Sequence, residues 1–274
     1  MTEDRRILLD GVAVQVERHG DELRASDGRV VGVDEAVHLP PTEPTKIIAV
    51  HLNYPSRSDE FMTKLPPAPT YFHKPITALN SHKGAVVRPA GLQWLNYEGE
   101  IVIVIGKAGR RIPQADALSH IAALSLCHEG TIRDWVRHAK FNVTQGKNFD
   151  ATGSIGPWLV PFKDEVQIAD VRLTTRVNGE TRQEDRTSRM IFSGTPANSR
   201  PVQPGDVVEV EVDGLGRLTN HVVEGPEPIR SDVGAQPTSS EEVVSTALGG
   251  DWEFRGIRTP SKDLYPSRIE ESTE

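Results

Sequence analysis

Residues 97–107 read Y-E-G-E-I-V-I-V-I-G-K, a short acidic repeat followed by five consecutive β-branched residues. An unbroken apolar run of this kind predicts a strand that is buried on both faces. Because successive side chains of a strand point to opposite faces, we expect Glu98 and Glu100 side by side, opposite Gly99 and Ile101. Carboxylates at the mouth of such a strand are costly unless they are paired or bind a cation. The stretch therefore predicts the central strand of the fold and an acidic site at its start.

A third carboxylate and a lysine follow the next apolar segments. Residues 122–127 predict a second buried strand, which ends just before Glu129. Lys147 follows the next apolar segment of the chain. Glu98, Glu100 and Glu129 would offer only oxygen ligands, which suit a hard ion such as Mg²⁺ or Mn²⁺ rather than zinc. The alternative interpretation of the same spacing is an acidic pair on a solvated strand edge.

Length, charge and cysteine content exclude several classes of protein. The chain has 274 residues and a formal net charge of −8, which argues against binding to nucleic acid or to anionic membranes. Residues 1–6 do not resemble a signal peptide and no apolar run is long enough to span a bilayer, so we expect a cytoplasmic protein. The only cysteine, Cys127, excludes an internal disulfide and is expected to be a buried thiol.

Several sequence blocks, in order, resemble one known family. They are N-Y-E-G-E-I-V-I-V-I-G-K (96–107), H-E-G-T-I-R-D-W (128–135), G-K-N-F-D-A-T-G-S-I-G-P-W (146–158), V-N-G-E (177–180) and P-G-D-V-V-E-V-E-V-D-G-L-G-R-L-T-N (204–220). Together they resemble the fumarylacetoacetate hydrolase family, and within it the branch that holds the isomerase and decarboxylase of homoprotocatechuate breakdown. The resemblance implies a mainly β (α+β) fold, with a mixed, rolled β-sheet, flanking helices and pairing into homodimers.

The order of apolar and turn-forming segments predicts the domain organisation. Residues 1–44 are expected to form a small N-terminal β subdomain that ends in a proline-rich linker, because short apolar runs alternate there with Gly- and Asp-rich turns. Residues 45–224 would form the catalytic domain, and the polar residues 225–274 a tail.

Further elements are expected inside the catalytic domain. Residues 46–51 predict a buried strand, and residues 113–121 a helix that packs on the sheet. Residues 172–177 and 207–212 predict strands, with a hairpin turn at Asn178 and Gly179.

One segment departs from the pattern of the hydrolases in this family. Their motif reads L-N-Y-x-x-H-x-x-E, in which the histidine and the glutamate activate water, whereas residues 52–60 here place Arg57 at the histidine position and keep Glu60. Arginine has no acceptor atom and cannot take a proton from water, but it can hold a carboxylate in a bidentate grip. An exposed loop arginine is the alternative interpretation. His51, just upstream, is either a replacement base or a core histidine.

The resemblance also implies three substrate contacts. Lys74 would lie beside the site, Arg133 would lie near the metal and the substrate, and Thr195 would reach the oxo-acid end of the substrate. For Arg133 the alternative is a salt bridge to Glu129 or Asp134.

Two departures from the family affect this site. Glu129 replaces an aspartate of the family, which extends the carboxylate by roughly 1.5 Å, one C–C bond length. The chain is also shorter by about a helix and a strand near residues 193–196.

These features predict a metal-dependent isomerase or decarboxylase of a small-molecule 2-oxo or enol dicarboxylic acid from aromatic catabolism. Lys147 would neutralise developing negative charge, and Arg133 or Arg57 would orient a substrate carboxylate. One alternative is an acylpyruvate-type C–C hydrolase with Glu60 or His51 as the base. The other is a catalytically impaired relative that acts as a binding protein.

Overall fold

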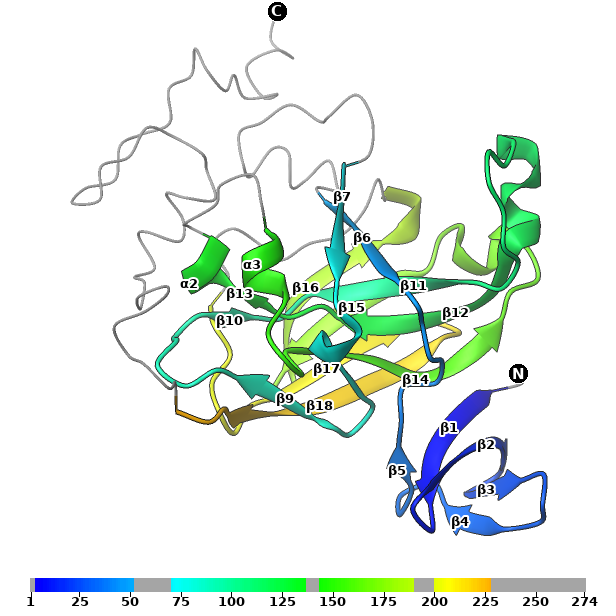
Figure 1. Ribbon diagram of the computed structural model, residues 1–274, viewed down its shortest axis with the longest axis horizontal. Coiled ribbons are helices and arrows are strands. Elements are labelled where there is room, and N and C mark those ends of the chain that lie inside the picture. Colours follow the sequence, from blue (N-terminus) through cyan, green and yellow to red (C-terminus); the bar gives the residue numbers. More distant parts are fainter. Residues whose placement is uncertain (1–2, 52–69, 137–142, 190–199, 228–274) are drawn as a thin grey trace, which may run out of the picture.

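A computed structural model describes residues 3–51, 70–136, 143–189 and 200–227, drawn in colour in Figure 1. Arg57, Glu60 and Thr195, the shortened region near residues 193–196 and most of the polar tail lie outside the described residues.

The larger of two main sheets has nine strands and contains the run predicted to be the central strand. Seven of these strands follow the order β11-β12-β14-β1-β2-β3-β4, while β5 pairs with β1 and β8 pairs with β14. The strands are β1 (Asp4–Leu9), β2 (Val12–His19), β3 (Glu22–Ala25), β4 (Val30–Gly32), β5 (Val37–His38), β8 (Leu79–Ser81), β11 (Gly99–Ile105), β12 (Ile121–His128) and β14 (Gly153–Pro161).

A second sheet of five strands, in the order β16-β15-β17-β18-β9, packs against the first. Its strands are β9 (Ala85–Arg88), β15 (Arg172–Val177), β16 (Glu180–Arg186), β17 (Val207–Val212) and β18 (Gly216–Glu224). Two further sheets have two strands each. They pair β6 (Ile47–His51) with β7 (Thr70–Lys74), and β10 (Leu95–Asn96) with β13 (Thr131–Ile132).

The helices of the described part of the chain are short. The α-helices are α2 (Arg133–Val136) and α3 (Thr144–Lys147), and the 3₁₀ helices are η1 (Ile76–Ala78), η2 (Gln114–His120), η3 (Glu165–Ile168) and η4 (Thr187–Arg189). No helix in these ranges is long and apolar enough to cross a bilayer. The prediction of a mainly β fold is confirmed.

Apolar side chains from both main sheets form the core that supports β11 and β12. One cluster joins Leu124 and Leu126 of β12 to Leu173 of β15 and Val210 of β17. Gly99 allows the close approach, since a Cβ there would lie 2.2 Å from the Thr175 hydroxyl oxygen. The start of β11 is therefore fixed against the second sheet.

The N-terminal strands lie together at one end of the molecule (Figure 1). They surround a separate cluster of buried residues that includes Ile7, Val16 and Leu23. Strand β1 touches the rest of the large sheet through a pairing of Asp4 with Leu159 in β14. These strands therefore have an apolar core of their own while remaining hydrogen-bonded to the larger unit.

The prediction that residues 101–105 are buried on both faces is wrong. Strand β11 is the edge strand of the nine-stranded sheet, and Ile103 and Ile105 are 48% and 63% exposed. The apolar run correctly predicts a strand, but β11 extends past the second sheet, so its far half lacks cover from the other described elements. Strand β12, by contrast, is buried from residue 123 onward, as predicted for residues 122–127.

Two more predictions about local structure need correction. Strand β6 forms as predicted but belongs to a two-stranded sheet and is only half-buried, with Ile48 58% exposed. The helix predicted at residues 113–121 is the 3₁₀ helix η2, of which only His120 is buried. It lies at the far end of the β11–β12 hairpin instead of on the sheet (Figure 1).

The strand predicted at residues 172–177 and the hairpin turn predicted at Asn178 and Gly179 are confirmed. Strands β15 and β16 pair antiparallel, and Asn178 and Gly179 between them both have positive φ angles, of 52° and 79°. Two consecutive positive φ angles are typical of the tight turn that favours Asn-Gly.

Candidate metal centre

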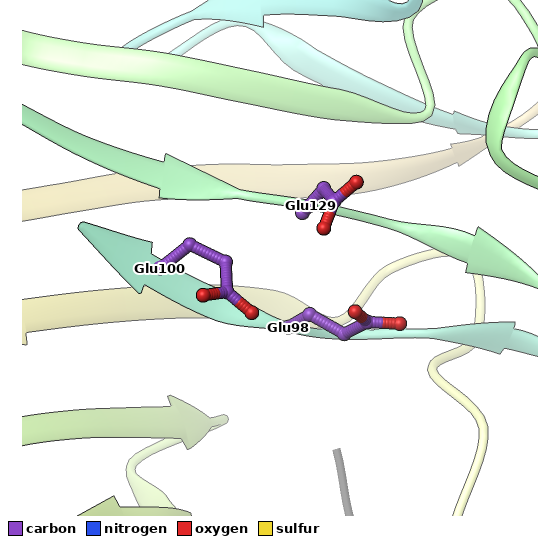
Figure 2. A group of neighbouring side chains, drawn as sticks. All are labelled: Glu98, Glu100 and Glu129. Carbon is purple, nitrogen blue, oxygen red and sulfur yellow. The ribbon is translucent and has the colours of Figure 1, made fainter. Parts of the chain in front are cut away.

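Strands β11 and β12 bring the three predicted glutamates together. The strands pair antiparallel, with Gly99 opposite His128 and Glu100 opposite Cys127. Glu98 therefore precedes β11 at the same end of the sheet at which Glu129 follows β12. One carboxylate oxygen from each of Glu98, Glu100 and Glu129 lies within 4.8 Å of the other two (Figure 2).

Glu98 is held by hydrogen bonds to both of its carboxylate oxygens. Its Oε2 accepts a hydrogen bond from Lys147 Nζ at 2.7 Å, and its Oε1 accepts one from the Thr131 hydroxyl. Its main-chain carbonyl accepts the Glu129 N–H at 2.7 Å, which links two of the carboxylates through the backbone. Burial alone would raise the pKa of Glu98, but Lys147 and these hydrogen bonds outweigh it and lower the pKa. Glu98 is therefore an anion at neutral pH.

Glu129 is less completely satisfied than Glu98. Its Oε2 lies 3.3 Å from Lys147 Nζ, whereas its Oε1 is buried without a hydrogen-bond partner among the described residues. Burial raises the pKa of Glu129, the nearby charge of Glu98 raises it further, and Lys147 only partly offsets both effects. A buried carboxylate oxygen of this kind is costly unless a proton or a cation satisfies it.

Lys147 is the last residue of α3 and is buried between the two carboxylates. Burial lowers its pKa, but Glu129 and Glu98 outweigh that effect and the net shift is upward, so the side chain is an ammonium. The Phe72 ring lies 5.3 Å from Nζ. At Gly146 a Cβ would approach the Ile132 carbonyl to 2.7 Å, so this glycine lets α3 pack closely on β13.

The residues present fit a hard divalent cation. The donor set consists of carboxylate oxygens, which Mg²⁺ and Mn²⁺ prefer. One ammonium shared by Glu98 and Glu129 leaves a buried Glu129 oxygen without a partner in the described part of the chain. A divalent cation beside Glu129 and Glu100 would satisfy that oxygen. The joint role of Glu98, Glu100 and Glu129 as metal ligands stays a prediction. The short distances between their carboxylate oxygens support it.

Lys74, in β7, lies next to the backbone of the residues that form the site. It is buried, and its Nζ donates to the main-chain carbonyls of Lys147, at 2.7 Å, and Gly130, at 3.4 Å. Burial lowers the pKa of Lys74, while the charge of Glu129 opposes this effect. Lys74 thus holds the backbone next to Glu129 and Lys147, and its predicted contact with substrate stays a prediction.

Arg133 begins α2 at the edge of the same site. Its main-chain N–H donates to the Trp94 carbonyl at 2.8 Å, and its charge contributes to the lowered pKa of Glu98. The neighbouring Asp134 carboxylate accepts the main-chain N–H groups of Trp94, at 2.8 Å, and Gln93, at 3.3 Å. Asp134 therefore anchors the segment before β10, and Arg133 lies within electrostatic range of the acidic group.

Two supporting residues were missed by reasoning from the sequence. Thr131 donates to Glu98, and the buried His128 accepts the Glu98 N–H at Nδ1 over 3.3 Å. Burial lowers the pKa of His128 to about 4, so its ring is neutral and can accept this bond. Both residues belong to the H-E-G-T segment around Glu129, so their position beside a predicted metal ligand was the signal in the sequence that could have identified them. Cys127 is buried as predicted, and burial raises the pKa of its thiol.

The fold and site together define a class of mainly β proteins with a group of three carboxylates that could hold a cation. The family model described as "Fumarylacetoacetate (FAA) hydrolase C-terminal" matches residues 46–194 and 190–223. The chain belongs to the fumarylacetoacetate hydrolase family, as the resemblance in its sequence predicted.

Individual relatives agree with this assignment. The chain is 32% identical over 233 residues to an uncharacterised protein of Archaeoglobus fulgidus, a match that covers 77% of this chain and 92% of that protein. It is 31% identical over 248 residues to the 4-hydroxyphenylacetate degradation bifunctional isomerase/decarboxylase of Salmonella dublin, covering 81% of this chain and 57% of the relative. The chain thus spans little more than half the length of that bifunctional protein.

Among solved structures, the chain resembles 5-carboxymethyl-2-hydroxymuconate delta-isomerase from Mycobacterium smegmatis. The TM-score is 0.72 at 29% sequence identity, and the match covers 83% of this chain and 100% of the other.

Proposed function

We propose that the chain is a divalent-metal-dependent isomerase or decarboxylase of a 2-oxo or enol dicarboxylic acid from aromatic catabolism. The observation that carries the proposal is the group of three glutamates within 4.8 Å, one of which has a buried oxygen without a partner among the described residues. The isomerase and isomerase/decarboxylase names of the two relatives given above support the reaction class.

Glu98, Glu100 and Glu129 would hold Mg²⁺ or Mn²⁺. When bound, such an ion supplies a Lewis acid that polarises a 2-oxo group and stabilises negative charge on its oxygen. Thr131 and Lys147 keep the Glu98 carboxylate in place, and the Glu129 N–H bond to the Glu98 carbonyl fixes the separation of the two backbones.

The cations around the acidic group would handle the substrate. Lys147 lies against two of the carboxylates, so its ammonium is placed to neutralise charge that develops on a substrate next to them. Arg133 would orient a substrate carboxylate from the neighbouring helix. Lys74 would support the backbone at Gly130 and Lys147. Arg57 and Thr195, outside the described residues, keep the roles predicted from the sequence.

The acylpyruvate-type hydrolase is a second candidate, because the chain keeps Glu60 of the water-activating pair. We rank it lower since Arg57 replaces the histidine of that pair and cannot accept a proton from water. Detection of pyruvate and a free acid from an acylpyruvate, with the reaction abolished by Glu60→Gln, would reverse the ranking.

Two proposals about organisation accompany the function. The separate apolar cluster of β1–β5 supports an N-terminal subdomain over residues 1–44, followed by the catalytic domain at 45–224 and the tail at 225–274. The family resemblance and the exposed isoleucines of β11 support a homodimer.

Isothermal titration calorimetry with Mg²⁺ and Mn²⁺ tests the proposal directly. We expect wild-type protein to bind one ion per chain, and we expect Glu100→Gln to weaken binding at least about tenfold, since it removes a charged ligand. Glu165→Gln, a change in the exposed first turn of η3, is the matched control. Absence of binding at millimolar metal would favour the alternative of a binding protein without catalysis.

A further inference from the structure

The two-stranded sheet of β6 and β7 has one face directed at the metal centre. In its antiparallel register, Lys74 lies opposite Ile47, Phe72 opposite Ala49, and Thr70 opposite His51. Residues opposite each other in such a pair project from the same face. Lys74 and Phe72 are buried, whereas Tyr71 is 64% exposed on the other face.

The buried members of this face identify what it covers. The Lys74 ammonium donates to the main-chain carbonyl of Lys147 at 2.7 Å, and the Phe72 ring lies 5.3 Å from Lys147 Nζ. The face that carries Lys74 and Phe72 therefore lies against α3 and the side chain that bridges Glu98 and Glu129. His51 projects from that same face, at the last residue of β6.

The charges that act on His51 agree with this placement. They come from Lys147 of α3, Glu98 before β11 and Arg133 of α2, which are all residues of the proposed site. Burial is the largest influence and lowers the pKa of His51, and Lys147 lowers it further. The imidazole is therefore neutral at pH 7 and has a ring nitrogen that can accept a proton.

We propose that His51 is the proton-transfer residue of this enzyme, placed by the β6–β7 register on the face that covers Lys147 and Glu98. The inference deepens the proposed function and rests on it. A neutral ring nitrogen of His51 takes a proton from one position of the substrate's conjugated oxo-acid system and returns it to another. The substrate changes its double-bond position, no proton is gained or lost overall, and His51 ends the cycle neutral.

This assignment provides a base that Arg57 cannot supply. A guanidinium stays protonated and has no acceptor atom, whereas an imidazole is the side chain best suited to general acid–base work near neutral pH. The sequence alone left His51 open between a replacement base and a core histidine. The register favours the first interpretation, because it places the half-buried His51 on the same face of the β6–β7 sheet as Phe72 and Lys74.

The test measures deuterium uptake at C3 of pyruvate in D₂O by NMR, with Mg²⁺ or Mn²⁺ present. Pyruvate is a minimal oxo-acid probe, and proton loss at C3 needs a base but not the natural substrate. We expect His51→Ala to lower the catalysed exchange rate by about 10² to 10⁴-fold, the usual contribution of a general base. Added imidazole should restore part of the rate in His51→Ala and leave wild type unaffected, an effect that a structural role would not produce.

Ile48→Ala is the matched control, because Ile48 lies one strand position away from Ala49 on the exposed face of β6. It should keep the wild-type exchange rate, and calorimetry should give equal metal affinities for all three proteins. An exchange rate in His51→Ala within about threefold of wild type would overturn the role of His51 while leaving the proposed function intact. Wild-type protein that neither binds metal nor exchanges pyruvate would overturn the proposed function itself, and this inference with it.

Discussion

Two regions of the molecule bury polar side chains in opposite ways. Near the start of β11, the carboxylates of Glu98 and Glu129 are buried together with the ammonium of Lys147, which contacts both of them. Between β5 and the β8–β9 turn, His38 and His82 pack edge to face, with ring centroids 4.9 Å apart and an interplanar angle of 73°. The first region is stable only when charges are matched, and the second only when both rings are neutral.

The pKa shifts show the same contrast. Burial lowers the pKa of His38 to about 4, and burial and the neighbouring His38 lower that of His82 to about 3. The acidic cluster instead divides its shifts, with the pKa of Glu98 lowered and that of Glu129 raised. Groups whose environments push their pKa values apart are typical of functional sites, whereas a neutral buried pair is typical of packing. The pKa shifts of the acidic cluster are thus of the kind expected of a functional site, and those of the histidine pair are of the kind expected of packing.

Removal of Lys147 should have the largest effect. In Lys147→Met, the buried carboxylates of Glu98 and Glu129 would lose the ammonium that they share, and breaking such a buried ion pair costs about 3–5 kcal/mol of unfolding free energy. We expect urea denaturation at pH 7 without metal to show this loss, and millimolar Mg²⁺ or Mn²⁺ to recover part of it, because the ion supplies positive charge at the same place. Lys163→Met, at an exposed position, is the control. Equal stability of Lys147→Met and wild type would contradict the charge-matched interpretation.

Replacement of Glu129 tests the unsatisfied oxygen. Glu129→Gln keeps the shape but removes the charge, and we expect metal affinity to fall by roughly 10–100-fold. Because the pKa of Glu129 is raised, the folded protein binds this proton more tightly than the unfolded chain does, so its contribution to stability is present at low pH and lost as pH rises above 4.5. The variant should lose this decline, measured by denaturation without metal at pH 4 and pH 8. A metal affinity unchanged from wild type would remove Glu129 from the ligand set.

The histidine pair should show the opposite dependence on pH. Below the ordinary pKa of 6.5 the unfolded chain takes up protons that folded His38 does not bind until about pH 4, so stability falls as the pH is lowered through this window. His38→Leu should reduce this fall by at most about 1.4 kcal/mol per pH unit while changing stability little at pH 8. Thermal melts between pH 4.5 and pH 8 measure it, with the exposed His19→Leu as the control. An unchanged slope in His38→Leu would show that the pair is not buried neutral.

The sequence was sufficient to predict the acidic region but not the histidine pair. Glu98, Glu100 and Glu129 lie at fixed places relative to two successive strands, so the period of a strand and antiparallel pairing bring them together. His38 and His82 come from segments more than 40 residues apart in the sequence, which the pairing of β5 with β1 and of β8 with β14 brings together, and no local pattern encodes such contacts. The sequence also could not predict the face of the sheet from which His51 projects, because that face depends on the register between β6 and β7.

Burial was the property that the sequence predicted least well. Residues 101–105 and 123–127 form neighbouring strands, but β11 is an edge strand whose far half extends past the second sheet, whereas β12 lies between β11 and β14. An apolar run records that a strand forms and says little about what covers each face. A substitution at an exposed isoleucine of β11 therefore gives a reference value for the change in unfolding free energy, with which substitutions in the two buried regions can be compared.

Ile103→Thr should have the smallest effect of the series. Ile103 is 48% exposed, and threonine keeps the β-branched shape that suits a strand, so we expect the unfolding free energy to change by no more than about 0.5 kcal/mol. Urea denaturation at two protein concentrations, tenfold apart, measures the change in unfolding free energy. Val210→Thr, at a buried core position, is measured in the same way for comparison. A cost above about 1 kcal/mol that grows with protein concentration would mean that a second copy covers β11 in solution, since only an intermolecular contact depends on concentration. In that case the proposed homodimer would pair through this edge, and the predicted burial of the strand would hold for the assembly although it fails for the single chain.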